Sequence, residues 1–352
     1  MEQSPSSMRP SNSHHKRYII SPISDGIFFI FSPILALVIG IGISGTPFAD
    51  QEFQIGNSTE SLSEFLIGIF IMGHLFAVFF RSHGNSKIFS LYPKRFLLVP
   101  ILLMVAMLSS PWIALSLSLL ATWWDVYHSS LQTFGLGRIY DMKSGNNGNI
   151  GRKEDWLLNL LLYVGPVIGG VCFIDHLDDF YGYAEVDAEF ITRIPDIALQ
   201  YHGVLRWGLL IFGSCFLLYY LFRYLQYHRQ GYRFSTQKIL LLSSTGFCSI
   251  YTWGFNTFYE AFFIMNFFHA LQYFALMWWT ERQNIRKRFY LPEGKVGSVL
   301  ALASFLSICT LYGLWTSYVD LSNSFYYSLT IVISLLHFWF DGFIWSVRKK
   351  AV

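Results

Sequence analysis

Ten long apolar runs constrain this chain more than any other feature of its sequence. A helix needs about 20 mostly apolar residues to cross the hydrocarbon core of a bilayer. The runs lie at about 25–45, 63–81, 95–110, 111–136, 156–174, 203–224, 238–255, 258–280, 296–317 and 325–346. Only 13% of the 352 residues are charged, whereas a soluble domain carries roughly 25%, so too little polar surface remains to cover a water-exposed fold. The sequence therefore predicts an all-α, polytopic transmembrane helix bundle of about ten spans.

Loop charges give these spans a direction. Basic side chains precede the first run and follow the even-numbered runs, whereas the alternate loops are acidic. The basic set comprises Lys16, Arg17, Arg81, Lys87, Lys94, Arg95, Arg138, Lys143, Arg152, Lys153, Arg223, Arg229, Arg233, Arg282, Arg286, Lys287, Arg288, Arg348, Lys349 and Lys350. Because loops rich in Lys and Arg stay on the cytoplasmic side, both termini are expected there. The short loops favour the bacterial inner (plasma) membrane, and the dispersed positive charge gives nucleic-acid binding no support.

A single domain accounts for nearly the whole sequence. We expect a polar N-terminal tail at 1–22, one transmembrane bundle at 23–348 and a basic C-terminal end at 349–352. Within the bundle, the acidic segment 175–202 is expected to form an outer loop, and Ser109-Ser110-Pro111 to join two runs as a tight hairpin. The four cysteines are far apart and lie inside apolar runs, so neither a disulfide framework nor a zinc knuckle is predicted.

Four histidines inside the apolar runs are the strongest functional signal. His74, His128, His269 and His337 lie one to a run, in even-numbered runs that point the same way. Each precedes a charged residue at the cytoplasmic end by 7 to 12 residues, which corresponds to about 10 to 18 Å along a helix. Ionisable side chains at such depth are costly and are functional-site candidates. We therefore expect the four imidazoles to meet in one layer of the bundle.

Three of these histidines have a carboxylate or amide at helical spacing on the same face. The neighbours are Asp125 and Gln132 for His128, Asn266 and Gln272 for His269, and Asp341 for His337. Such groups typically fix the tautomer and orientation of a metal-ligating imidazole, and a buried carboxylate needs a cation or hydrogen-bond donors to offset its desolvation. We therefore predict the four histidines as metal ligands, the three amides as their supporting groups, and the two aspartates as catalytic proton carriers.

The ligand types limit the choice of metal. An all-imidazole set suits iron, zinc or copper. The HExxH motif of zinc proteases is absent from the chain, and no two of the four histidines share a run, which disfavours the histidine boxes of diiron desaturases. One histidine on each of four helices favours a mononuclear, non-haem Fe2+ centre with an open position for O2. Zinc, or haem held by pairs of histidines, is the alternative cofactor.

The same pattern resembles a known family. Four lone histidines on separate helices of an aromatic-rich bundle resemble the Brp/Blh-type membrane dioxygenases, which cleave beta-carotene with iron held by histidines. The resemblance covers architecture and ligand number rather than a contiguous motif. Segments 124–135 and 337–345 are similar to those of uncharacterised bacterial multi-pass membrane proteins. The resemblance implies an oxygenase or dioxygenase that takes O2 and a lipophilic, carotenoid-like small molecule.

The apolar substrate is expected to enter from the lipid bilayer along an aromatic-lined cleft. Candidate lining residues are Trp123, Trp124, Tyr127, Phe268, Tyr273, Trp278, Phe338 and Trp339. A proton-coupled transporter is the rival class, because buried Asp and His pairs also form proton relays. A membrane protein that only binds haem is the third alternative.

Overall fold

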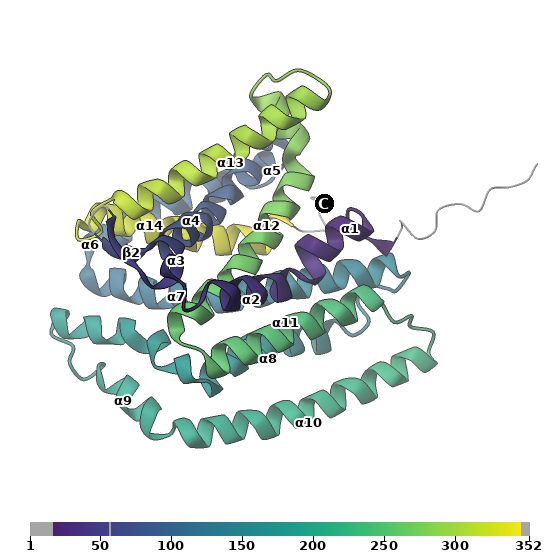
Figure 1. Ribbon diagram of the computed structural model, residues 1–352, viewed down its shortest axis with the longest axis horizontal. Coiled ribbons are helices and arrows are strands. Elements are labelled where there is room, and N and C mark those ends of the chain that lie inside the picture. Colours follow the sequence, from purple (N-terminus) through teal and green to yellow (C-terminus); the bar gives the residue numbers. More distant parts are fainter. Residues whose placement is uncertain (1–16, 56–57, 346–352) are drawn as a thin grey trace, which may run out of the picture.

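The computed structural model describes residues 17–55 and 58–345, and nearly all of them are helical (Figure 1). The elements are α1 (Pro22–Asp25), η2 (Gly26–Ile30), α2 (Ser32–Ile43), α3 (Pro47–Asp50), β1 (Glu52–Ile55), β2 (Ser58–Ser61), α4 (Leu62–Ser82), α5 (Ser86–Leu91), α6 (Pro93–Ser109), α7 (Pro111–Lys143), α8 (Arg152–Gly169), η3 (Val171–Phe173), η4 (Asp175–Val186), α9 (Arg193–Gln200), α10 (His202–Arg229), α11 (Thr236–Phe255), α12 (Phe258–Arg288), α13 (Lys295–Tyr318) and α14 (Ser324–Ile344). Most of the predicted N-terminal tail and all of the basic C-terminal end lie outside the described residues.

A helix occupies each of the ten apolar runs within the described part of the chain. The expectation of an all-α fold needs one small correction, because β1 and β2 pair antiparallel with Glu52 opposite Ser61 and Gln54 opposite Thr59. This two-stranded hairpin leads directly into α4. Ser61 ends the strand and caps the helix: its hydroxyl accepts from the Glu64 amide, and the Glu64 carboxylate accepts from the Ser61 amide. Such a capping box fixes where a helix begins.

Length and apolarity identify five to seven candidate spans among the described residues, so the ten predicted spans are not confirmed. Among the described residues, five helices are long and apolar enough to cross a membrane: α4, α10, α12, α13 and α14. Two bent pairs raise the number to seven if each pair is one span. They are Pro22–Ile30 with Ser32–Ile43, bent by 58°, and Arg152–Gly169 with Val171–Val186, bent by 88°. The chain therefore has the architecture of a multi-pass membrane protein with at least five candidate spans.

Local chemistry separates neighbouring helices that the hydropathy nearly merges. Asn256 and Thr257 adopt extended backbone between α11 and α12, and the Thr257 hydroxyl accepts from the Glu260 amide to begin α12. Between α6 and α7, Ser110 is extended and Pro111 opens the next helix, a position where the missing N–H of proline costs nothing. In both cases the two helices then pack against each other, as the predicted hairpin of α6 and α7 requires.

The helices pack in two connected groups (Figure 1). In the first, α4 contacts α12, α13 and α14, and α14 also contacts α6 and α7. In the second, α8 contacts α7, α10 and α11. Helix α10 lies at the edge of the molecule, and only 11% of its most apolar stretch is buried against the rest of the protein. An apolar helix that is so exposed is suited to lipid rather than to water.

Close approach of backbones joins α4 to α13. A Cβ added at Gly313 would lie 2.2 Å from the Ile69 carbonyl oxygen, so only glycine fits there. Small residues at such contacts allow transmembrane helices to pack tightly. This contact fixes the position of α4, the helix that carries His74.

The acidic segment predicted as an outer loop is partly helical and packs on the bundle. It contains η4 and α9, and η4 contacts α7. Asp179 accepts hydrogen bonds from Ser118 and Thr122, at 3.3 and 2.8 Å, and the Tyr183 hydroxyl lies 2.7 Å from that of Ser116. The segment therefore covers the N-terminal half of α7.

Candidate metal centre

All four histidines of the apolar runs meet in one cluster. We call His74 of α4, His128 of α7, His269 of α12 and His337 of α14 the histidine cluster. Ring centroids are 4.9 Å apart for His74 and His337, 4.8 Å for His337 and His128, 5.1 Å for His128 and His269, and 5.1 Å for His269 and His74. Each imidazole thus touches two others, and the contacts close a ring. No member is more than 4% exposed.

Backbone carbonyls fix the tautomer of two members. His74 Nδ1 is hydrogen-bonded to the Ile71 carbonyl, and His337 Nδ1 lies 3.2 Å from the Leu75 carbonyl. A carbonyl oxygen only accepts hydrogen bonds, so each Nδ1 donates and each neutral ring keeps a free lone pair on Nε2. In both histidines, Nε2 is therefore the atom whose lone pair can bind a metal.

The shortest contact inside the cluster joins His337 Nε2 and His128 Nε2, which are 3.1 Å apart. This spacing suits a hydrogen bond donated by His128. It also suits two nitrogens at adjacent positions of one metal, which are about 3.0 Å apart for bonds of about 2.1 Å at a right angle. The same pair therefore serves a metal site or a proton path.

Asp341 is the carboxylate that reaches the histidine cluster. Its Oδ2 lies 3.7 Å from His128 Nε2 and 3.9 Å from His337 Nε2. Its Oδ1 accepts hydrogen bonds from the Tyr273 hydroxyl and from the Trp345 indole N–H, both at 3.0 Å. Two donors hold one oxygen, so the other is directed at the imidazoles. The structure thus places Asp341 beside the cluster, as its spacing from His337 indicates.

Asp125 does not join Asp341 there, although both are predicted as proton carriers. It is half-buried and forms no hydrogen bond or ion pair within the described residues. Three residues leave the two side chains only about 60° apart around the helix, yet His128 reaches the other imidazoles and Asp125 does not.

The predicted supporting amides also have other partners. Gln132 Nε2 donates to the His269 carbonyl at 3.1 Å and to Gln272 Oε1 at 2.9 Å, and Gln272 in turn donates to Ser32 of α2. Asn266 donates to a carbonyl of its own helix. Among the described residues none of these three amides bonds to an imidazole. They support the cluster indirectly, since the glutamine pair ties α7 to α12 and α12 to α2.

Three imidazole nitrogens have no protein partner in the described part of the chain. They are Nε2 of His74 and both ring nitrogens of His269, all fully buried. Buried polar atoms are almost always hydrogen-bonded, and each one without a partner costs about 1–3 kcal/mol. A concentration of such atoms in one cluster therefore calls for a ligand.

The donor set fits a small divalent metal. One ligand atom each from His74, His269 and His337 lie within 4.8 Å of one another, and so do those of His128, His337 and Asp341. Two nitrogens on opposite sides of one metal are about 4.2 Å apart. Small side-chain adjustments would therefore bring these groups to a common ion. Imidazole with one carboxylate suits iron, zinc or manganese better than calcium or magnesium.

The eight candidate lining residues do not gather along one cleft. Tyr273 and Phe338 contact the histidine cluster, with Phe338 5.1 Å from the His128 ring, and Trp124 lies 6.4 Å from Phe338. Trp123 instead contacts His176, and Trp278 contacts Phe305. Among the described residues, Tyr273 and Phe338 therefore contact the cluster directly, and Trp124 is connected to it through Phe338.

Sequence reasoning named Tyr273 only as a lining residue and did not single out Trp345, although both donate to Asp341. Tyr273 follows His269 by four positions and Trp345 follows Asp341 by four, so the same helical spacing could have identified both.

Trp345 also stacks under Arg81, whose guanidinium carbon is 4.1 Å from the ring, and Arg81 pairs with the buried Glu281. Arg81 is thus a buried, ion-paired residue and not the solvent-exposed loop charge that its position suggests.

A second buried polar cluster was also missed. Arg138, Asp141, Asp155 and Lys238, which we call the ion-pair network, join α7, α8 and α11. Arg138 Nη1 lies 2.7 Å from Asp141 and 2.5 Å from Asp155, and Lys238 Nζ lies 2.8 and 2.7 Å from the same two carboxylates. Their spacing in sequence gives no hint of this, because 97 residues separate Lys238 from Asp141.

Fold and site together define a multi-pass helical protein with four imidazoles and one carboxylate in its interior. Comparison of the chain with protein-family models, with curated proteins and with solved structures finds no match. Function does not follow from fold alone, so it is argued from the chemistry of the histidine cluster.

Proposed function

We propose that this protein is a membrane-embedded, iron-dependent oxygenase that acts on a lipophilic substrate. The observation that carries the proposal is the closed ring of four imidazoles from four helices, three of whose nitrogens are buried without a partner. Other buried polar atoms of the bundle also have no partner among the described residues, such as those of Thr245, Ser249 and Tyr312, but none of those three hydroxyls belongs to a group of potential metal ligands. A bound metal gives these imidazole nitrogens a function.

Each residue of the site has a distinct role in this proposal. His74, His128, His269 and His337 hold the metal through neutral imidazoles, and the carbonyls of Ile71 and Leu75 orient two of the rings. Ferrous iron, when bound there, supplies the redox chemistry by which O2 reacts with an organic molecule. Asp341, held by Tyr273 and Trp345, places a proton acceptor beside the cluster and is the better candidate proton carrier than Asp125.

The lipophilic nature of the substrate is inferred from the surroundings of the cluster. Its nearest non-histidine rings are Tyr273, 4.6 Å from His337, and Phe338, 5.1 Å from His128. Phe338 connects to the half-buried Trp124 between α7 and α14. Apolar, aromatic walls with a few polar groups are typical of sites for small apolar ligands. A polyunsaturated, carotenoid-like molecule that reaches the site from lipid between α7 and α14 suits this lining.

The proposal includes a topology of ten spans with both termini cytoplasmic, in which the bent pair Pro22–Ile30 with Ser32–Ile43 forms the first span. The shortest of the nine other helices, α6, has 17 residues, which is about 26 Å of helix against a core of about 30 Å. Basic residues still mark one end of each helix pair, as the bacterial inner membrane requires. Labelling single cysteines placed in the α9–α10 and α13–α14 connections from outside intact cells tests this. Labelling of both supports ten spans, and protection of either contradicts them.

Metal analysis of the detergent-purified chain is the primary test. We expect about one iron per chain, and its loss in His269→Ala and His74→Ala. His176→Ala is the matched control: His176 is equally buried, but its Nδ1 bonds to the Cys172 carbonyl and its ring packs on Trp253. Iron retained in the control and lost in the cluster variants supports the site. A folded, metal-free wild type contradicts it, and a Soret band would identify haem instead.

A proton path through the same residues is the second candidate function. The 3.1 Å contact between His128 and His337, with Asp341 at 3.7 Å, gives an unbroken series of groups that exchange protons. Proton flux into liposomes separates the two functions. Flux through metal-free protein that is abolished in Asp341→Asn would support transport and oppose the oxygenase.

A further inference from the structure

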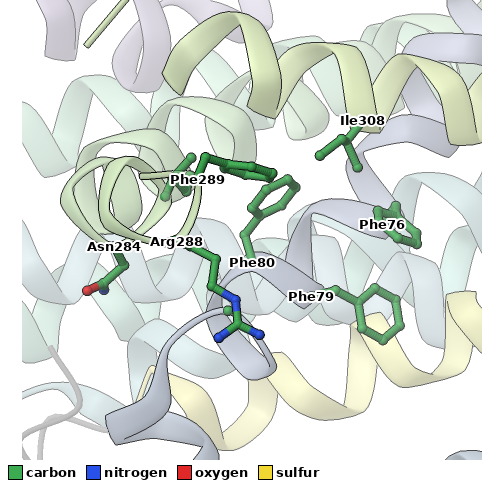
Figure 2. A pocket seen from close by; sticks show the side chains of 9 residues that line it. Phe76, Phe79, Phe80, Asn284, Arg288, Phe289 and Ile308 are labelled. Carbon is green, nitrogen blue, oxygen red and sulfur yellow. The ribbon is translucent and has the colours of Figure 1, made fainter. Parts of the chain in front are cut away.

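A small apolar cavity lies along α4 on the C-terminal side of His74, where α4 and α12 end beside α13. Its volume is about 210 Å³. It is lined by Phe76, Phe79, Phe80, Gly84, Asn284, Ile285, Arg288, Phe289 and Ile308 (Figure 2). Most of this lining is aromatic or aliphatic, and its single cation is Arg288. The cavity thus combines an apolar interior with one positive charge.

The turn after α12 builds the cavity. The Leu291 amide bonds to the Arg286 carbonyl and the Tyr290 amide to that of Lys287, while Tyr290 has φ 53°. This is the hydrogen-bond pattern of a helix that ends in a left-handed residue. It turns the chain back so that Phe289 lies beside Phe80 at the cavity, as Figure 2 shows.

Arg288 is exposed to solvent and has no protein partner within the described residues. It forms no hydrogen bond or ion pair there, whereas Arg286 lies 3.7 Å from Glu293 and Arg282 stacks on Trp279 at 4.2 Å. Lys287, which is also exposed, adds a second positive charge on the same turn. An anion placed at the mouth of the cavity would therefore meet a free guanidinium.

We propose that this cavity binds one acyl chain of an anionic phospholipid, with the phosphate of its headgroup on Arg288. Ligand pockets for compact molecules measure about 300–1,000 Å³, so a cavity of about 210 Å³ accepts a segment of a single chain. Two of the helices around it, α4 and α13, are apolar enough to span a membrane. Basic pockets between such helices recognise anionic headgroups at the membrane surface.

Native mass spectrometry of the detergent-purified, metal-free protein tests the proposal, because it does not depend on the histidine cluster. The probes are palmitoyl-oleoyl phosphatidylglycerol, phosphatidylcholine with the same chains, and sodium oleate. We expect phosphatidylglycerol to bind at least about fivefold more tightly than phosphatidylcholine. Arg288→Gln should abolish this preference, whereas Lys287→Gln, which removes the same charge one residue away and outside the lining, should keep it. Ile308→Trp, which fills the cavity, should weaken both phospholipids.

Four results would overturn the assignment. Equal binding of the two phospholipids would exclude headgroup recognition, and equal losses in Arg288→Gln and Lys287→Gln would reduce it to general surface charge. Unchanged binding in a folded Ile308→Trp protein would exclude the cavity. Binding of oleate in preference to phosphatidylglycerol would identify a free fatty acid as the occupant.

Discussion

The histidine cluster and the ion-pair network are both buried and polar, but they differ in how their groups are matched. In the network, two cations face two carboxylates, and three tyrosine hydroxyls donate to the same carboxylates, so that Arg138 Nε is the one side-chain nitrogen of the network without a partner among the described residues. In the histidine cluster, three ring nitrogens have no partner among the described residues. The charges of the network are therefore balanced by protein groups, whereas the lone pairs of the cluster are not.

This difference in the partners of the polar atoms indicates which of the two clusters binds a ligand. A buried charge that loses its partner costs several kcal/mol, so a matched network stabilises the contact of α7, α8 and α11. An unmatched lone pair is a cost to the fold that a ligand can remove. Buried polar groups thus indicate a structural role in the ion-pair network and a ligand-binding role in the histidine cluster. Four variants test this contrast.

Lys238→Met should produce the largest effect. It leaves Asp141 and Asp155 with Arg138 as their sole remaining cation, so we expect a loss of about 3–5 kcal/mol in unfolding free energy. Thermal unfolding in detergent measures it as a large drop in Tm, while metal content per folded chain should stay at the wild-type value. A folded variant with the wild-type Tm would show that the network is not structural.

His269→Leu should have the opposite effect: metal affinity should fall, while the stability of the metal-free protein should not. It removes two unpartnered nitrogens, so the metal-free protein should be unchanged or more stable by up to about 1–3 kcal/mol. Metal affinity should fall by more than about 100-fold, beyond the loss typical of an outer supporting residue. Metal titration of the refolded or chelator-treated protein gives the affinity, and Tm without metal gives the stability. A large fall in the metal-free Tm would assign His269 to packing.

Tyr273→Phe should lie between these two. Without the hydroxyl, Asp341 keeps only the Trp345 donor, and we expect metal affinity to fall by about 10–100-fold. The matched control is Tyr163→Phe, which removes a buried hydroxyl that pairs with Thr133 at 2.7 Å away from the cluster. If both variants change metal affinity equally, Tyr273 has no special role in holding Asp341.

Arg223→Gln should have the smallest effect. Arg223 lies 3.5 Å from Glu154, but its side chain is 35% exposed. Exposed ion pairs contribute about 0–1 kcal/mol, so Tm should hardly move. Arg223→Gln is the control for Lys238→Met. A drop in Tm as large as that of Lys238→Met would show that buried and exposed ion pairs do not differ in their contribution to stability.

The positions of the helices could be predicted from the sequence because hydropathy and capping are local properties. The run at 63–81 became Leu62–Ser82, and that at 258–280 begins at Phe258 behind the Thr257 cap. The helix in the fifth run ends earlier than predicted, at Gly169. The backbone of Gly170 is extended there and lies so close to α11 that an added Cβ would be 2.2 Å from the Trp253 carbonyl oxygen. That contact joins residues more than 80 positions apart, and no local pattern reports it.

The sequence by itself determined which residues could form a buried site, because four histidines in apolar runs stand out on any hydropathy profile. Their shared depth and the spacing of Asp341 from His337 were also readable, since a straight helix converts residue number into distance. Only the tertiary structure decided which partners these side chains meet. Packing of α7 brought His128 but not Asp125 to the other imidazoles, and packing of α12 and α14 on α4 brought Tyr273 to Asp341. The orientation of a helix about its axis depends on all its neighbours together, and spacing along one helix does not contain it.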